Sequence, residues 1–311
     1  MRTIARHFGL AIAGAGLLLA NTACAQQQSA PAPVPDAQAP AEEVELGGPA
    51  LWKLGDEDTT IYLFGTVHAL PNDVEWFNGS LAEALAQSDA VVTEILVDDD
   101  LPTEMQTIVM EKGLLPPGTQ LRSLMDEKQR VIYEAAMLKI GMQPGSFAPF
   151  EPWYAGMMMS MIPLLQQGYA PEQGVEKVLL GAAEGKQRLA LETIDEQIGV
   201  FDGLPQETQI KFLIDTAENV DQLKPMLDAM VAEWLEGDAE ELAKLMNDGM
   251  SDDVLAEALL FRRNQAWAVW LNKRLEEPGT VFVAVGAGHL AGKKSVQEWL
   301  KAEGLEVSRV Q

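Results

Sequence analysis

The sequence feature that most constrains the fold is residues 281–290, VFVAVGAGHL, near the end of the 311-residue chain. Five apolar residues, most of them β-branched or aromatic, run without a charge into a turn that contains two glycines and ends in His289. Such a run is typical of a strand buried on both faces in a parallel sheet. Glycine permits a tight turn and a close approach of backbone to a ligand. We therefore expect His289 at the carboxyl end of a central strand, where open α/β sheets bind ligands.

The same pattern occurs 221 positions earlier, in residues 61–68, IYLFGTVH, which end in His68. The only other histidine is His7, in the amino-terminal segment. Histidine is the commonest metal ligand and is well suited to proton transfer near neutral pH. Two histidines that both close a strand–GxxH unit therefore predict one shared site, provided that their strands are neighbours. A lone histidine at a strand end is more often a hydrogen-bonded packing residue, and the sequence leaves that alternative open.

Hydrophobic patterning predicts an α/β fold: a central mixed, largely parallel sheet with flanking helices and a long helical insertion. Residues 50–54 and 61–64 form an expected hairpin. A helical segment with four methionines, residues 157–161, can either line a groove or be a core helix, and we favour the core helix. Further strands are expected at 90–95, 188–192 and 305–310, and helices at 75–87, within 102–180, and within 206–246 and 252–277.

The amino terminus has the features of an export signal. Arg2 and Arg6 precede an apolar stretch, residues 8–20, which is too short to span a bilayer, and Ala-Cys-Ala at 23–25 fits a cleavage site. A competing interpretation is a lipoprotein anchored through Cys24, but Asn21 stands where lipobox patterns usually have leucine. We therefore expect an exported protein, periplasmic or extracellular, with no transmembrane segment in its mature chain.

Composition divides the chain and excludes some partners. We expect a signal peptide at 1–25, a Gln/Ala/Pro-rich linker at 26–45 and one domain at 46–311. The net charge of −25 argues against nucleic acid as a partner. If cleavage follows residue 25, the mature chain has no cysteine and therefore no thiol chemistry.

Three charged residues complete the predicted site. Glu94 ends a predicted strand and is the best carboxylate to join the two histidines, although a surface glutamate is an equal alternative. Arg263 is a candidate for stabilising an oxyanion, with a helix-surface salt bridge as its plain alternative. Glu192 either supports the site or caps a strand.

An ordered set of motifs over residues 50–311 resembles the TraB/GumN family and, more distantly, the TIKI proteins and erythromycin esterases. The motifs are Leu51-Trp52-Lys53, residues 62–68 through His68, the Glu94 strand, Glu151-Pro152-Trp153-Tyr154, Gly174-Val175-Glu176, Leu191-Glu192-Thr193 with Gln197, Arg263-Asn264 with Trp267-Ala268, and residues 284–292.

The resemblance implies a hydrolase-like site of paired GxxH motifs and a glutamate, at the positions of His68, His289 and Glu94. The TIKI branch is described as metal-dependent proteases that favour manganese or cobalt, whereas the esterase branch opens a lactone without an agreed metal. Family members often have Asp where this chain has Glu176, which leaves the role of that position open.

Three functions remain in competition. The first is a metal-dependent hydrolase, a peptidase, in which His68, His289 and Glu94 hold Mn²⁺, Co²⁺ or Zn²⁺ and a bound water attacks a peptide. The second is a metal-independent hydrolase of a small ester or lactone, with a histidine as general base. The third is a non-catalytic protein of the cell envelope that binds a peptide or glycan.

Overall fold

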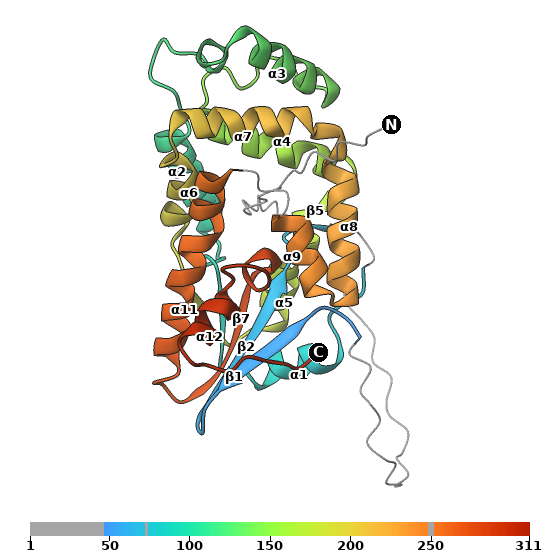
Figure 1. Ribbon diagram of the computed structural model, residues 1–311, viewed down its shortest axis with the longest axis vertical. Coiled ribbons are helices and arrows are strands. Elements are labelled where there is room, and N and C mark those ends of the chain that lie inside the picture. Colours follow the sequence, from blue (N-terminus) through green and yellow to red (C-terminus); the bar gives the residue numbers. More distant parts are fainter. Residues whose placement is uncertain (1–46, 72–73, 248–251) are drawn as a thin grey trace.

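The computed structural model describes residues 47–71, 74–247 and 252–311 (Figure 1). The predicted signal peptide and the whole of the predicted linker lie outside these residues. Within them the fold is α/β, built on a six-stranded mixed sheet. In spatial order its strands are β6 (Gln187–Ala190), β4 (Ala90–Thr93), β7 (Gly279–Gly286), β2 (Thr59–Thr66), β1 (Leu51–Gly55) and β8 (Ser308–Arg309).

Four adjacent strands of this sheet are parallel. β4 pairs in parallel with β6 and with β7, and β7 pairs in parallel with β2. The antiparallel part consists of β1, which forms the predicted hairpin with β2, and the short β8 beside it. The predicted largely parallel sheet is therefore confirmed, and β7 lies between the two strands that precede His68 and Glu94.

The alternation of side chains along β7 explains why it is apolar throughout. Val281, Val283 and Val285 pack in one hydrophobic cluster, whereas Phe282 and Ala284 pack in another on the opposite face. Successive strand side chains point to opposite faces, so a strand covered on both faces needs apolar residues at every position. α11 (Arg262–Arg274) and α12 (Val296–Ala302) cover the first face.

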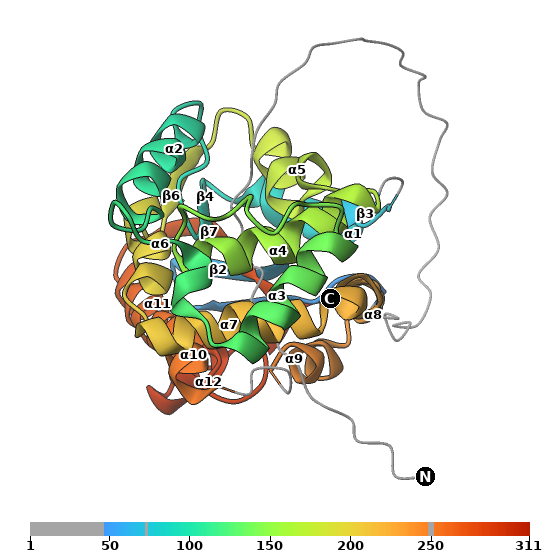
Figure 2. The same cartoon turned by 90° about the horizontal axis from the view of Figure 1, so that it is seen from above.

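A helical layer lies beyond the carboxyl ends of the parallel strands (Figure 1). It contains the methionine-rich helix α4, which packs against α7; Met157 and Met159 are buried, so this helix is part of the core. Figure 2 shows the layer from above, with α3, α4 and α7 over the sheet. The helices between the strands are α1 (Gly79–Gln87), α2 (Leu101–Lys112), α3 (Glu127–Lys139), α4 (Pro152–Gln166), α5 (Val175–Ala182), α6 (Ile194–Asp202), α7 (Gln206–Glu218), α8 (Leu223–Glu236), α9 (Ala239–Asn247) and α10 (Asp253–Ala256).

Several element boundaries differ from the sequence prediction; the strands expected at 90–95, 188–192 and 305–310 are shorter, at 90–93, 187–190 and 308–309. α1 begins at Gly79 rather than at residue 75, because Trp76 is taken into the core in an extended segment ahead of the helix. The helical region 206–246 is three helices, with one break after α7 and another at Gly237, whose φ of 73° ends α8 in the left-handed region. None of the helices in the described ranges is long and apolar enough to cross a membrane.

Candidate active site

The two GxxH histidines and Glu94 meet at the carboxyl edge of the parallel strands. His68 follows β2 by two residues, Glu94 follows β4 directly, and His289 ends a single 3₁₀ turn after β7. These three strands are adjacent and parallel, so their carboxyl ends lie at one edge of the sheet. The predicted convergence of the three side chains is therefore present in the fold.

Gly286, the first glycine of the second motif, marks the point of convergence. A Cβ atom built at this position lies 3.1 Å from Oε1 of Glu94, 3.4 Å from Cδ2 of His289 and 3.8 Å from Nε2 of His68. Its backbone, at φ −48° and ψ 132°, suits any residue. The glycine is therefore required for space among the three side chains and not for the conformation of the turn.

Two other glycines of the motifs, Gly65 and Gly288, also stand where a larger side chain would meet neighbouring atoms. A Cβ at Gly65 lies 3.0 Å from Cα of Ala287, so the two motif loops are in direct contact. A Cβ at Gly288 lies 2.7 Å from Cε of Met246 in α9. The contact at Gly65 is with backbone, which cannot easily move aside, whereas the atom near Gly288 is the end of a flexible methionine side chain.

Glu94 is buried and held by three donors. Oε2 accepts hydrogen bonds from Nη2 of Arg263 (2.7 Å) and Nε2 of Gln197 (2.8 Å), and Oε1 accepts from the backbone N–H of Gly286 (2.7 Å). Burial by itself raises the pKa of Glu94, but the charge of Arg263, the two histidines and the N–H of Gly286 together outweigh it, and the pKa falls to about 2. Glu94 is therefore an ionised, fixed carboxylate and a weak base.

His289 is buried and neutral. Burial and then the charge of Arg263 lower the pKa of its ring to about 3. Nη1 of Arg263 lies 3.3 Å from Nε2 and can only donate, so Nδ1 carries the proton and donates to Oδ1 of Asn264 at 2.5 Å. The amide nitrogen of Asn264 donates to the carbonyl of Lys294, which fixes the amide orientation. In this tautomer the lone pair of Nε2 accepts from Arg263, and Oε1 of Glu94 lies 3.9 Å from the same nitrogen.

His68 has the opposite charge state. Its Nδ1 lies 2.6 Å from Oε1 of Glu176, and the hydroxyl of Thr66 donates to the same oxygen at 2.6 Å. Burial lowers the pKa of His68, but the carboxylate of Glu176 outweighs it and raises the pKa to about 9. Since Nδ1 is bonded to Glu176, His68 can act on the site only through Nε2.

Arg263 lies between two carboxylates. Besides Glu94 it binds Glu192, whose carboxylate accepts from Nε at 2.9 and 3.1 Å and also from the indole N–H of Trp267. Nη1 donates to the carbonyl of Leu259 at 3.0 Å. The side chain is 8% exposed, so Arg263 is part of the buried site and does not form a salt bridge on the helix surface. Burial raises the pKa of Glu192.

Several residues of this network were not singled out from the sequence as site residues. The motifs of the family resemblance include Gln197, Asn264 and Glu176, but the sequence analysis assigned these residues no role in the site. One signal was available: a buried histidine needs an acceptor for its second ring nitrogen, and Asn264 lies next to Arg263 in the sequence. Glu176 and Gln197 lie far along the chain from His68 and Glu94, which they contact, so no local pattern indicated their roles.

The donor chemistry of the site suits a divalent cation. Both imidazoles have Nδ1 bonded to an oxygen and Nε2 turned inward, the arrangement found for metal-bound histidines, and Glu94 adds a carboxylate oxygen. Among the described residues, however, no three His, Cys, Asp or Glu side chains already stand close enough together to form a metal cluster. The residues therefore fit a cation in type and orientation, and the presence of a metal stays a prediction.

Comparison with known proteins identifies the family of the chain. Residues 50–309 match the TraB/PrgY/gumN family, and the chain therefore belongs to that family. It is 25% identical over 242 residues to the uncharacterized protein YbaP of Escherichia coli (strain K12), covering 77% of this chain and 87% of YbaP. It is 20% identical over 270 residues to an uncharacterized protein of Treponema pallidum, covering 82% and 80%.

A more distant relative has a named activity. The chain is 24% identical over 300 residues to the metalloprotease TIKI2 of Danio rerio, covering 79% of this chain and 57% of that protein. No solved structure matches the chain significantly. Family membership and this relative together fit a hydrolase-like protein.

Proposed function

We propose that this protein is a hydrolase that activates water between His68, Glu94 and His289. The observation that carries the proposal is the convergence of the three side chains on Gly286, at the edge of the sheet where α/β folds place ligands. The similarity to a protein named as a metalloprotease favours a peptide substrate.

We further propose that the hydrolase uses a divalent cation, Mn²⁺, Co²⁺ or Zn²⁺. The donors that would hold it are Nε2 of His289, a carboxylate oxygen of Glu94 and Nε2 of His68, which would release its proton on binding. Such a cation lowers the pKa of a bound water toward neutrality. The low pKa values of Glu94 and His289, about 2 and 3, support the use of a cation. Both groups are too weakly basic to deprotonate ordinary water at neutral pH.

The protein's own groups have distinct tasks in this proposal. Glu176 orients His68, Asn264 orients His289, and Gln197 with the N–H of Gly286 orients Glu94. Arg263 balances the buried carboxylates and presents its guanidinium to the site, where it stabilises negative charge that develops on a substrate carbonyl oxygen.

One contact favours the second candidate, a metal-independent hydrolase of a small ester. Nη1 of Arg263 lies 3.3 Å from Nε2 of His289, so a positive charge already stands at the nitrogen that a metal needs. In that case Arg263 stabilises the oxyanion without a cation, and Nε2 of His289 exchanges its hydrogen bond with Arg263 for one with the attacking water before it acts as the base.

The test is hydrolysis of peptides and of small esters by purified protein, with and without chelator and with single metals restored. We expect peptide cleavage that chelator abolishes, that one metal restores, and that His68→Ala and His289→Ala each lower by at least about 100-fold. Lys128→Ala, an exposed residue of α3, is the control. Full activity in excess chelator supports the ester hydrolase, and activity that survives both histidine substitutions overturns both candidates.

We also propose that the protein is exported, as residues 1–25 predict. Mass spectrometry of the mature protein is expected to give an amino terminus at Gln26 in the periplasm or medium. A lipid-modified Cys24 at the amino terminus, lost in Cys24→Ser, would instead establish a lipoprotein.

A further inference from the structure

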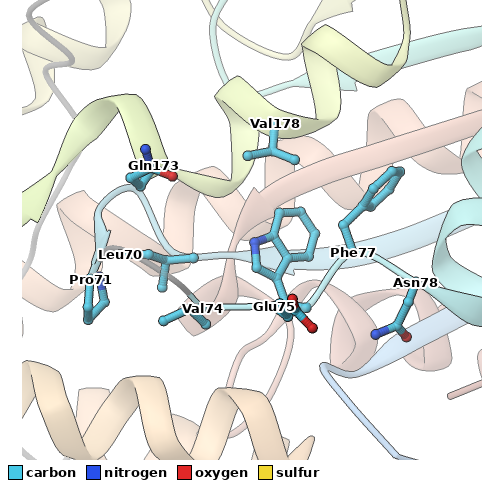
Figure 3. Close-up of a pocket in the computed structure, with 9 residues that line it drawn as sticks. Leu70, Pro71, Val74, Glu75, Phe77, Asn78, Gln173 and Val178 are labelled. Atoms are coloured by element: carbon cyan, nitrogen blue, oxygen red, sulfur yellow. The ribbon is translucent and has the colours of Figure 1, made fainter. Parts of the chain in front are cut away.

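A cavity of about 270 Å³ lies beside the loop that carries His68 (Figure 3). Apolar side chains of Leu70, Val74, Trp76, Phe77 and Val178 line it, and polar groups make up a comparable share of its surface. Pockets for whole drug-sized ligands have volumes of about 300–1,000 Å³. This cavity is smaller, and its size suits a single side chain better than a complete ligand.

The floor of the cavity is rigid and is anchored to the first GxxH motif. Trp76 is 4% exposed and stacks on Phe64 of β2, with ring centroids 5.8 Å apart and planes at 17°. Trp234 packs edge-on against Trp76 at 5.5 Å, and its indole N–H donates to the carbonyl of Gly65 at 2.8 Å. The cavity and the motif therefore share a fixed frame, which is the condition for a pre-formed binding site.

The segments that line the cavity also hold His68. Leu70 lies two residues beyond His68, and because an extended chain spans at most about 3.6 Å per residue, their Cα atoms are within about 7 Å. On the other wall, a Cβ at Gly174 would come within 2.2 Å of the carbonyl oxygen of His68. Val178 follows Gly174, in the helix α5. The same helix carries Glu176, whose carboxylate contacts Nδ1 of His68.

The rim is polar, with Glu75, Asn78 and Gln173. All three are exposed, and two of them are amides that can pair with a peptide backbone. Glu75 places a carboxylate at the entrance, and the chain as a whole carries a charge of −25. An acidic group that entered would lose its hydration without gaining an opposite charge, so the cavity selects against it.

We infer that this cavity is a specificity subsite, which takes a large uncharged apolar side chain of a peptide substrate whose scissile bond lies at His68, Glu94 and His289. The inference rests on the proposed function and adds a substrate preference to it. The apolar walls bind the side chain, and the amides of the rim bind the adjacent backbone. Peptides with Leu, Met or Phe near the scissile bond are therefore preferred over peptides with Asp or Glu at the same position.

The test changes the depth of the cavity at Val178 in both directions. Val178→Trp fills it and is expected to lower kcat/KM for peptides with Phe by at least about tenfold relative to those with Ala. Val178→Ala deepens it and is expected to shift preference toward Trp and Phe. The matched control is Val131→Trp, because Val131 on α3 is 64% exposed and far along the chain from the cavity. Thermal unfolding verifies that each variant is folded.

A second measurement separates this inference from the proposed function. Binding of N-acetyl-phenylalaninamide is followed by ligand-observed NMR and is expected in the natural protein and in Val131→Trp, but not in Val178→Trp. If that pattern appears without any hydrolysis, the proposed function fails and the cavity stands as a binding site. Hydrolysis without side-chain preference, equal in Val178→Ala and the natural protein, overturns the subsite alone. Absence of binding together with absence of hydrolysis overturns both.

Discussion

At the scale of single residues, the charge state of each site side chain depends on which of its atoms is already hydrogen-bonded or ion-paired. His68 and His289 differ little in sequence context, yet one is held by a carboxylate and the other by an amide and a guanidinium. The pKa of the first is raised to about 9 and that of the second is lowered to about 3. Matched motifs therefore produce one positively charged and one neutral histidine at neutral pH.

Gly286→Ala tests the importance of space at the centre of the site. The added methyl carbon comes within 3.1 Å of Glu94 and 3.4 Å of His289, while the backbone angles suit alanine. We expect activity to fall at least about tenfold with less than about 1 kcal/mol of lost stability. Gly145→Ala is the control, since nothing lies within 4 Å of its Cβ. Unchanged kcat/KM in Gly286→Ala contradicts the placement of the reaction at this point.

The His68–Glu176 pair predicts how stability depends on pH. The folded pKa of His68 is raised from 6.5 to about 9, so the pair stabilises the protein fully below pH 6.5 and loses this contribution as pH rises through about 9. The loss is at most about 3 kcal/mol. Urea unfolding between pH 6 and 10 measures it.

Glu176→Gln provides the comparison for that measurement. It removes the carboxylate but keeps a hydrogen-bond acceptor of similar size, so the pKa of His68 should fall and the stability of the variant should vary less over the same pH range. Two identical stability profiles would show that the pair does not titrate as described.

At the scale of elements, one irregular helix positions the arginine of the site. A π-helical turn, Glu257–Phe261, precedes α11, and the N–H of Arg262 bonds to the carbonyl of Glu257, five residues back. The carbonyl of Leu259 accepts from the side chain of Arg263. π-Turns within helices often occur at functional sites. Here the turn lies directly before the guanidinium that joins Glu94 to Glu192.

Arg263→Ala is expected to destabilise the protein by about 3–5 kcal/mol, because it leaves two buried carboxylates without their counter-charge. Its neighbour Arg262 is the natural control. The side chain of Arg262 is 73% exposed, so Arg262→Ala should change stability by less than about 0.5 kcal/mol. Urea unfolding of both variants at pH 7 gives the comparison. Equal losses of stability would contradict the role of Arg263 as the buried counter-charge of Glu94 and Glu192.

At the scale of the whole molecule, the chain unites four parallel strands and places its helical layer over their carboxyl ends (Figures 1 and 2). The strand order puts β7 between β4 and β2, so the two motifs and Glu94 arrive from three neighbouring strands. The same arrangement makes any ligand of these residues a stabiliser of the folded state, because the unfolded chain separates them.

Binding of a divalent cation is therefore expected to raise the thermal unfolding temperature. At a cation concentration 100 times its Kd, the folded state gains about 2.7 kcal/mol, or an increase of several degrees in Tm. Mn²⁺, Co²⁺ and Zn²⁺ are each compared by differential scanning fluorimetry. In the His68→Ala/His289→Ala double variant the increase should disappear. An equal increase in that variant assigns the binding to the acidic surface instead.

The sequence by itself predicted the main strands and the two motifs, and it predicted a shared site on the condition that the strands are neighbours. Those properties follow from local patterns: a strand buried on both faces must be apolar at every position, and parallel neighbours end on the same side. Thus residues 281–290 were enough to predict His289 at the carboxyl end of a central strand, whereas the strand order that brings His68 and Glu94 beside it came only from the tertiary structure.

Only the tertiary structure decided the chemical state of the site. Gln197 and the N–H of Gly286 reach Glu94 from 103 and 192 residues away, and Glu176 reaches His68 from another helix. The charge of a buried group depends on desolvation and on partners within a few ångströms. Local sequence patterns do not predict contacts between residues so far apart in the chain. The sequence therefore identified the two histidines but could not show that one is charged and the other neutral.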